Sequence, residues 1–176
     1  MRKLKMEELN RVSAAEFKEL PKIPVVLVLD NVRSLHNVGS AFRTADAFRV
    51  EKIYLCGITG TPPNKEINKT ALGATESVDW EYVADTGTLA RQLQAAGYRI
   101  IALEQAEKTT LLQDFQPDPA QPLAFVFGNE VFGVAEEVMA LADQVVEIPQ
   151  FGTKHSLNIS VTVGVVVWDY LLKTHL

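Results

Sequence analysis

The chain has 176 residues, of which 47% are apolar and 22% are charged, as in one globular domain with a sizeable core. Its formal net charge of −5 argues against a general nucleic-acid-binding protein, and its single cysteine, Cys56, excludes an intramolecular disulfide. We expect a cytoplasmic protein without a membrane segment, because a lone cysteine suits a reducing compartment and no apolar stretch reaches the roughly 20 residues of a membrane span.

The N-terminal segment is polar and basic. It lacks the apolar stretch of a secretory signal, and residues 6–19 have the spacing of a short amphipathic helix that Pro21 would end. Residues 1–70 hold 12 lysines and arginines against 8 acidic residues, whereas residues 71–176 hold 5 against 14. Two interpretations stay open for residues 1–22: a basic face that attracts a polyanion, or a solvated helix face whose cations pair with neighbouring glutamates.

Strands and helices alternate along the rest of the chain. A polar turn over 31–40 and a Gly/Pro-rich region over 57–64 interrupt the apolar runs. We predict strands at 25–29, 52–56, 78–83, 99–103, 123–127 and 145–148, and helices at 41–48, 66–72, 88–96 and 134–142. This alternation predicts a single α/β domain with a parallel, mostly buried sheet, in which Cys56 is a buried apolar residue rather than a nucleophile.

The last segment, residues 156–172, combines conflicting signals. Its many β-branched residues favour a strand, but 17 residues are too many for a typical strand. Ser156, Ser160 and Gly164 place a small residue at every fourth position, on one face of a helix. We therefore predict a helix that packs closely against another part of the protein.

Three short motifs follow strand-like runs, where ligands collect at the edge of an open α/β sheet. The first is Asn37-x-Gly39-x-x-x-Arg43. Asn37 can cap a helix that starts near residue 38, and the Arg43 guanidinium offers a planar fork for a phosphate. By itself this motif is also that of an ordinary capped helix.

The other two motifs follow the same logic. Phe127-Gly-Asn-Glu130-x-x-Gly133 places a glycine and two polar side chains between a strand and a helix, although Glu130 also suits the helix dipole. Ile148-Pro-Gln-x-Gly152-x-x-x-Ser156-Leu-Asn158 closes a strand and opens the final helix, for which Ser156 and Asn158 are also good caps. Three such motifs in one chain indicate a shared site.

Several other functional classes do not fit. The chain has neither the phosphate-binding loop G-x-x-x-x-G-K-[ST] nor the dinucleotide fingerprint G-x-G-x-x-G. His36, His155 and His175 lack the spacing of metal ligands, so we expect no metal site, and no Ser-His-Asp or Cys-His nucleophile arrangement is present.

Together, in this order and spacing, the three motifs resemble those of the SpoU–TrmH family of the SPOUT superfamily, which are RNA ribose 2′-O-methyltransferases. The resemblance runs from residue 24 to residue 172. It implies a parallel sheet whose C-terminal part forms a trefoil knot, a SPOUT methyltransferase domain over residues 24–176, and an N-terminal helical extension over residues 1–23 that contacts RNA. It also implies a homodimer that binds S-adenosylmethionine in the knot, with Gly39, Gly128 and Gly152 as clearances around the cofactor and the threaded chain.

The resemblance also assigns roles to individual residues. It places the cofactor against Leu103, Gly128, Ile148 and Leu157. It gives the catalytic set as Asn37, Arg43, Glu130, Ser156 and Asn158. Because a guanidinium is effectively always protonated, we expect Arg43 to clamp a phosphate and orient the ribose hydroxyl, while a polar partner or the phosphate accepts the proton.

The RNA substrate is less defined. Many relatives carry a separate N-terminal RNA-binding domain, whereas here about 23 residues precede the first predicted strand, which is more typical of tRNA-modifying members. We therefore expect tRNA as the substrate, with rRNA as an alternative. A catalytically inactive knotted RNA-binding module and a nucleotide-handling α/β enzyme without an RNA substrate are the competing hypotheses.

Overall fold

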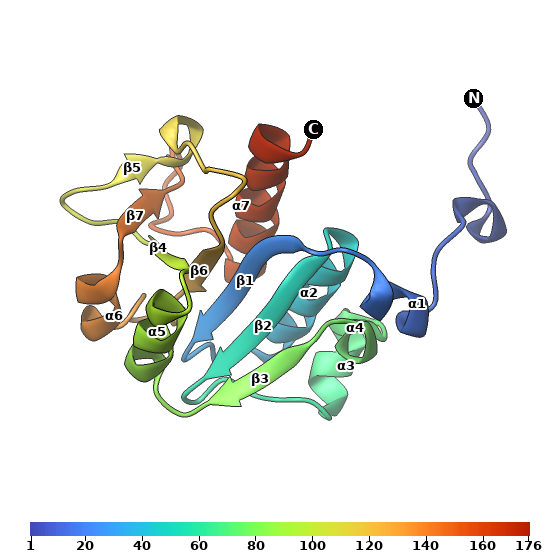
Figure 1. Cartoon of the computed structure of the whole chain (residues 1–176), viewed down its shortest axis with the longest axis horizontal. Coiled ribbons are helices and arrows are strands. Elements are labelled where there is room, and N and C mark those ends of the chain that lie inside the picture. Colours follow the sequence, from blue (N-terminus) through green and yellow to red (C-terminus); the bar gives the residue numbers. More distant parts are fainter.

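The computed structural model describes residues 1–176, apart from the side chain of Met6. Seven parallel strands form one sheet in the order β3-β2-β1-β6-β4-β7-β5 (Figure 1). They are β1 (Ile23–Asp30), β2 (Val50–Cys56), β3 (Trp80–Val83), β4 (Arg99–Leu103), β5 (Thr110–Leu111), β6 (Leu123–Phe127) and β7 (Gln144–Glu147). The predicted parallel α/β fold is therefore confirmed, and β5 is an additional strand at the edge of the sheet.

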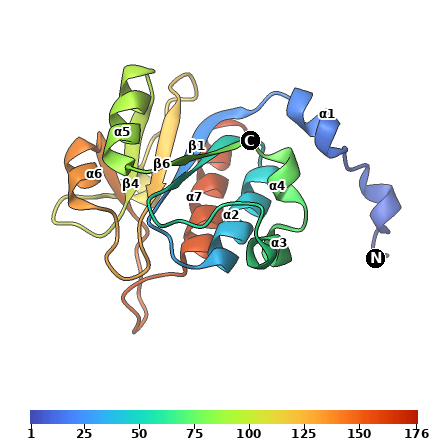
Figure 2. The same ribbon diagram turned by 90° about the horizontal axis from the view of Figure 1, so that it is seen from below.

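The helices cover both faces of the sheet. They are η1 (Met6–Leu9), α1 (Ala14–Glu19), α2 (Leu35–Ala47), α3 (Lys65–Ala71), α4 (Ala74–Ser77), α5 (Thr86–Ala95), η2 (Leu112–Asp114), α6 (Glu136–Leu141) and α7 (Ile159–Thr174). Figure 2 shows α5 and α6 on one face and α7, α2, α3 and α4 on the other. A sheet covered on both faces explains why its central strands are almost continuously apolar.

Two hydrophobic clusters lie on opposite faces of the central strands. Leu27 and Phe125 belong to the cluster under α2 and α7, while Val26 and Val126 belong to the cluster under α5 and α6. The alternation follows from the period of two along a strand, and all five residues of β6 are buried. Cys56 is buried in the second cluster, as the sequence predicted.

The N-terminal helix predicted over residues 6–19 is wrong as one element. The chain forms η1 and then α1, because Asn10 adopts a left-handed conformation and a new N-cap follows at Ser13. The Ser13 hydroxyl accepts a hydrogen bond from the Glu16 N–H, and the Glu16 carboxylate accepts one from the Ser13 N–H. Phe17 is buried, whereas the segment before it extends away from the body of the molecule (Figure 1).

Helix α2 begins six residues earlier than predicted. Ser34 is its N-cap, with its hydroxyl accepting a hydrogen bond from the Asn37 N–H at 3.2 Å, so the predicted polar turn over 31–40 is largely helical. Asn37 therefore lies in the first turn rather than at the cap, and Arg43 lies two turns further along. This correction leaves the Asn37 side chain free for a partner outside the helix.

The final segment is a helix, as predicted, although it begins at Ile159 rather than at residue 156. Asn158 is its N-cap, with Oδ1 accepting from the Ser160 N–H at 2.9 Å. Val163, Val166, Val167 and Tyr170 face the core. The expected close packing at Gly164 is absent within the described chain, since no atom would lie within 4 Å of a Cβ added there.

Across the described residues, none of the helices is both long enough and apolar enough to cross a membrane.

Candidate functional site

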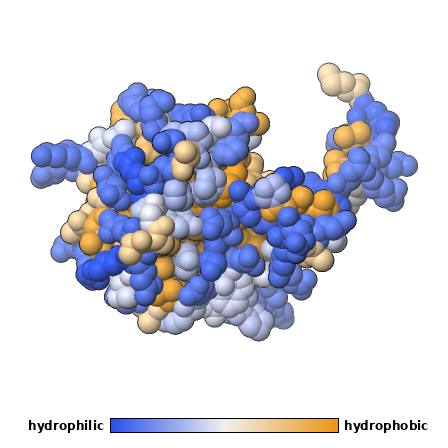
Figure 3. All heavy atoms as spheres, viewed as in Figure 1, coloured by the Kyte–Doolittle hydropathy of each residue, from blue (hydrophilic) through white to orange (hydrophobic). Residues whose placement is uncertain are grey.

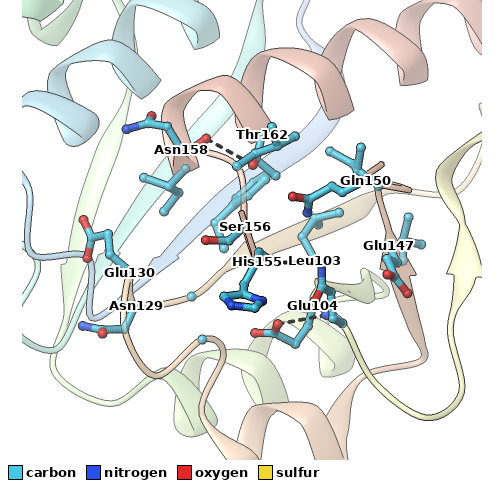
Figure 4. Close-up of a pocket in the computed structure, with 18 of the residues that line it drawn as sticks. Leu103, Glu104, Asn129, Glu130, Glu147, Gln150, His155, Ser156, Asn158 and Thr162 are labelled. Atoms are coloured by element: carbon cyan, nitrogen blue, oxygen red, sulfur yellow. Dashed lines mark hydrogen bonds between the residues drawn. The ribbon is translucent and has the colours of Figure 1, made fainter. Parts of the chain in front are cut away.

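A cavity of about 480 Å³ lies at the carboxyl ends of β4, β6 and β7 (Figure 4). Leu103, Phe127 and Glu147, the last residues of these strands, line it together with residues of the segments that follow. Its remaining wall comes from residues 155–159, which lead into α7. The predicted cofactor residues all line this one cavity: Leu103, Gly128, Ile148 and Leu157.

The charge of the cavity wall is negative. Three carboxylates line it, from Glu104, Glu130 and Glu147, and the described lining contains no lysine or arginine. His155 is the remaining titratable side chain in the wall. Such a wall attracts a cationic ligand and repels polyphosphates.

The loop between β6 and α6 is folded back on itself at one side of the cavity. The backbone N–H groups of Asn129 and Gly133 each donate to the carbonyl of the other at 2.9 Å. A Cβ at Gly128 would lie 2.1 Å from the Gly133 carbonyl carbon, so this position needs glycine. The Glu104 carboxylate closes the loop by accepting from the Val134 N–H at 3.0 Å.

Glu130 joins this loop to the start of α2. Its carboxylate accepts from the Arg33 N–H at 2.9 Å, the Ser34 N–H at 3.0 Å and the Asn37 side-chain amide at 3.2 Å. Partial burial raises the pKa of Glu130, but these hydrogen bonds outweigh it and bring the pKa below its ordinary value. Glu130 is therefore an anion whose oxygens are already engaged, which suits positioning better than proton transfer.

Asn37 and Asn158 extend this connection to α7. The Asn158 side-chain amide donates to Asn37 Oδ1 at 3.1 Å, while Asn158 Oδ1 accepts from the Ser160 hydroxyl at 2.6 Å. The three predicted motifs thus meet through one hydrogen-bonded chain that runs Glu130–Asn37–Asn158. In Figure 4, Glu130 and Asn158 lie on the same side of the cavity.

Arg43 and Ser156 differ in position. Ser156 lines the cavity just before α7. Arg43 is exposed on α2 and does not line the cavity; it borders a second hollow of about 460 Å³ with Lys69, Ser40, Thr44 and others. Within one copy of the protein, four of the five predicted catalytic residues therefore lie together, and Arg43 lies apart from them.

Two of the three glycines predicted to give clearance around the cofactor serve different purposes. A Cβ at Gly39 would lie 2.2 Å from the Ile67 carbonyl oxygen, so this glycine makes room for α3. Gly128 makes room for Gly133, and a Cβ at Gly152 would meet no atom within 4 Å. At Gly39 the expectation was wrong because helix–helix packing, not a ligand, sets the space there.

The predicted set missed several polar residues of the cavity wall, among them Glu104 and His155. Glu104 directly follows β4, the same strand-end position that marked the three motifs, so its location was a usable signal. His155 lies inside the third motif but was set aside because it lacks metal-ligand spacing. Among the residues that the structure describes, no group of three or more His, Cys, Asp or Glu side chains could hold a metal ion.

The chain is similar in sequence to known RNA methyltransferases. The sequence model of the SpoU rRNA methylase family matches residues 24–168. The 23S rRNA (guanosine-2′-O-)-methyltransferase RlmB of Neisseria meningitidis is 33% identical over 150 residues, which are 85% of this chain and 59% of that protein. The tRNA (guanosine(18)-2′-O)-methyltransferase of Thermus thermophilus is 33% identical over 146 residues, 82% of this chain and 73% of that protein.

A solved structure has the same fold. The S-adenosylmethionine-bound rRNA methyltransferase of Sinorhizobium meliloti superposes with a TM-score of 0.79 at 26% identity. The superposition covers 89% of this chain and 59% of that protein. This chain thus spans about three fifths of the Neisseria and Sinorhizobium proteins.

Proposed function

The chain belongs to the SpoU rRNA methylase family, and from this premise we propose that it transfers a methyl group from S-adenosylmethionine to the 2′-hydroxyl of a ribose in RNA, in the cytoplasm. The observation that carries the proposal is the meeting of the three motif segments through the hydrogen bonds Glu130–Asn37–Asn158, beside a cavity that the second and third motifs line. The named substrates of the relatives are 23S rRNA and tRNA, so both stay candidates.

The cavity suits S-adenosylmethionine on physical grounds. Its volume of about 480 Å³ lies in the range of small-molecule sites, and Leu103, Ile148 and Leu157 provide apolar contacts for an adenine ring. Its three carboxylates attract the sulfonium and repel the phosphates of ATP or NAD, which weighs against a nucleotide-handling enzyme. When bound, S-adenosylmethionine supplies an electrophilic methyl group, and the residues of this chain orient the ribose.

Arg43 fits a phosphate clamp rather than a cofactor contact. It is exposed, permanently charged and close to Lys69 and three hydroxyl-bearing side chains around the second hollow. A nucleotide whose ribose enters the first cavity would carry its flanking phosphates outside, where a guanidinium on α2 can hold them. Holding the phosphate fixes the hydroxyl in line with the methyl group, which is how positioning lowers the barrier.

We also propose a homodimer with a C-terminal trefoil knot. In support of the dimer, Val161, Val165, Trp168 and Leu172 form an exposed apolar stripe on α7, with Trp168 45% exposed. Such a stripe is typical of an interaction site, and Gly164 beside it leaves space for a close approach. In support of the knot, the segment after β7 passes the cavity before α7 packs beside α2 (Figure 2).

The N-terminal extension, residues 1–23, is proposed to contact RNA next to the methyltransferase domain, residues 24–176. The part of it before Phe17 stands away from the body, and hydrophilic residues cover most of that part (Figure 3). Lys3, Lys5 and Arg11 are exposed there, and the described structure records no ion pair for them. A basic arm of this kind adds phosphate contacts without sequence readout.

The direct test incubates the protein with total tRNA or total rRNA from a strain that lacks it, using S-adenosylmethionine labelled in the methyl group. We expect labelled 2′-O-methylnucleosides after digestion of one of these RNAs. Arg43→Ala should abolish turnover while its dissociation constant for S-adenosylmethionine, measured by calorimetry, stays within a few-fold of wild type. An absence of methylation with both RNAs would refute the function, and tighter binding of ATP or NAD would favour the nucleotide-handling enzyme.

A further inference from the structure

The wall of the cavity contains one imidazole side chain, that of His155. Its titratable residues are Glu104, Glu130, Glu147 and His155, and only an imidazole has an ordinary pKa near 6.5. Figure 4 shows the His155 ring inside the cavity, on the side of Glu104. No part of the polar chain Glu130–Asn37–Asn158 involves this ring.

The proposed reaction must dispose of one proton. The ribose oxygen forms a bond to the methyl carbon, the carbon–sulfur bond breaks with its electron pair going to sulfur, and the hydroxyl proton must leave. Arg43 cannot accept it, because the guanidinium is already protonated and lies outside the cavity. A side chain of the cavity wall with a free acceptor atom can take it instead.

Each of the three carboxylates of the wall accepts at least one hydrogen bond, and Glu147 accepts only one. Glu130 holds two backbone N–H groups and Asn37, Glu104 accepts from the N–H groups of Val134 and Gln105, and Glu147 accepts from the Thr109 hydroxyl at 3.0 Å. By contrast, the His155 ring has no hydrogen-bond partner among the described residues. Its backbone is held in place, since the His155 carbonyl accepts from the Gln105 side-chain amide at 3.1 Å.

We propose that His155 is the general base that accepts the 2′-hydroxyl proton, an inference that rests on the proposed methyl transfer. Neutral imidazole takes the proton as the oxygen–carbon bond forms, becomes imidazolium, and then releases the proton to water. The charged groups that face it are Glu104 from the end of β4, Glu130 from the loop before α6, and Glu147 from β7. Lys154, its neighbour in the chain, does not line the cavity.

A general base defines the expected pH dependence. It accepts a proton only in its unprotonated form, so kcat/KM should rise with pH and then reach a plateau. General bases typically contribute about 100-fold to 10,000-fold. Removing the base should therefore cost about 100-fold or more in kcat and abolish the ascending limb of the profile.

The experiment compares wild type with His155→Gln and with His175→Gln as the matched control. His175 lies at the exposed C-terminal end of α7, outside the cavity. Rates are measured from pH 5.5 to 9 with total tRNA and total rRNA from a strain lacking the protein, and S-adenosylmethionine affinity is measured by calorimetry. We expect the His155 variant alone to lose activity and the ascending limb, with cofactor affinity within about three-fold of wild type.

Each other result counts against the inference in a recognisable way. If the activity of His155→Gln stays within three-fold of wild type and its pH profile keeps the same ascending part, His155 is not the general base, while the proposed methyl transfer stands. Loss of cofactor affinity in proportion to activity would make His155 a cofactor contact instead. A wild-type protein that methylates neither RNA refutes the proposed function, and the inference falls with it.

Discussion

Gly39→Ala tests which neighbour the glycine of the first motif makes room for. Gly39 is buried in the middle of α2, and an added Cβ would lie 2.2 Å from both the Ile67 carbonyl oxygen and the Thr70 hydroxyl. The same Thr70 hydroxyl donates to the His36 carbonyl at 2.9 Å. The methyl group would therefore push α3 away by more than 1 Å and strain the bond that joins the two helices.

The expected cost follows from two opposing effects. Overpacking a core contact typically costs about 1–3 kcal/mol, and the backbone oxygen at 2.2 Å places this contact at the upper end of that range. Replacing a helical glycine by alanine returns about 1 kcal/mol of helix propensity. We therefore expect the free energy of unfolding to fall by about 2 kcal/mol, or the melting temperature by roughly 4–8 °C.

Urea unfolding of wild type, Gly39→Ala and Ser40→Ala measures this effect. Ser40 is the next residue of α2, is half-buried and makes no recorded side-chain hydrogen bond, so its variant should stay within about 0.5 kcal/mol of wild type. The affinity for S-adenosylmethionine should be unchanged in both variants. A Gly39→Ala protein as stable as wild type but weaker in cofactor binding would refute the packing explanation and restore the ligand clearance first expected from the sequence.

Three further predictions address other parts of the molecule. Because the pKa of Glu130 is lowered in the folded state, its ionised carboxylate stabilises the fold above the unfolded pKa of about 4.3, and this stabilisation is lost as the pH falls through the folded pKa. The melting temperature of Glu130→Gln should therefore fall less steeply than that of wild type from pH 7 to pH 3. Parallel curves for the two proteins would contradict this. Burial raises the pKa of the Cys56 thiol to about 12, so iodoacetamide at pH 8 should label it only after unfolding, and labelling of the native protein would show that the strand is accessible. Charge reversal at Lys3, Lys5 and Arg11 should weaken RNA binding and flatten its salt dependence, whereas unchanged binding would support the solvated-face interpretation.

The alternation of apolar runs was enough to predict the sheet and nearly all of its strands. A strand buried on both faces needs a run such as Val25–Leu29, and this requirement is local in the sequence. Helix boundaries were less accurate, because caps depend on side-chain hydrogen bonds that several residues can make. Ser34 rather than Asn37 caps α2, and Asn10 with Ser13 divides the N-terminal helix in two.

The sequence by itself determined the family and the motifs of the site, since strand-end glycines and polar residues in a fixed order are a property of the chain. Only the tertiary structure decided what each residue does there. In the folded protein, Glu130 accepts hydrogen bonds from two backbone N–H groups, Arg43 lies on the outer face of α2, and Glu104 and His155 lie in the cavity wall. These outcomes depend on contacts between segments nearly 100 residues apart, which packing of the folded sheet brings together and which no local pattern encodes.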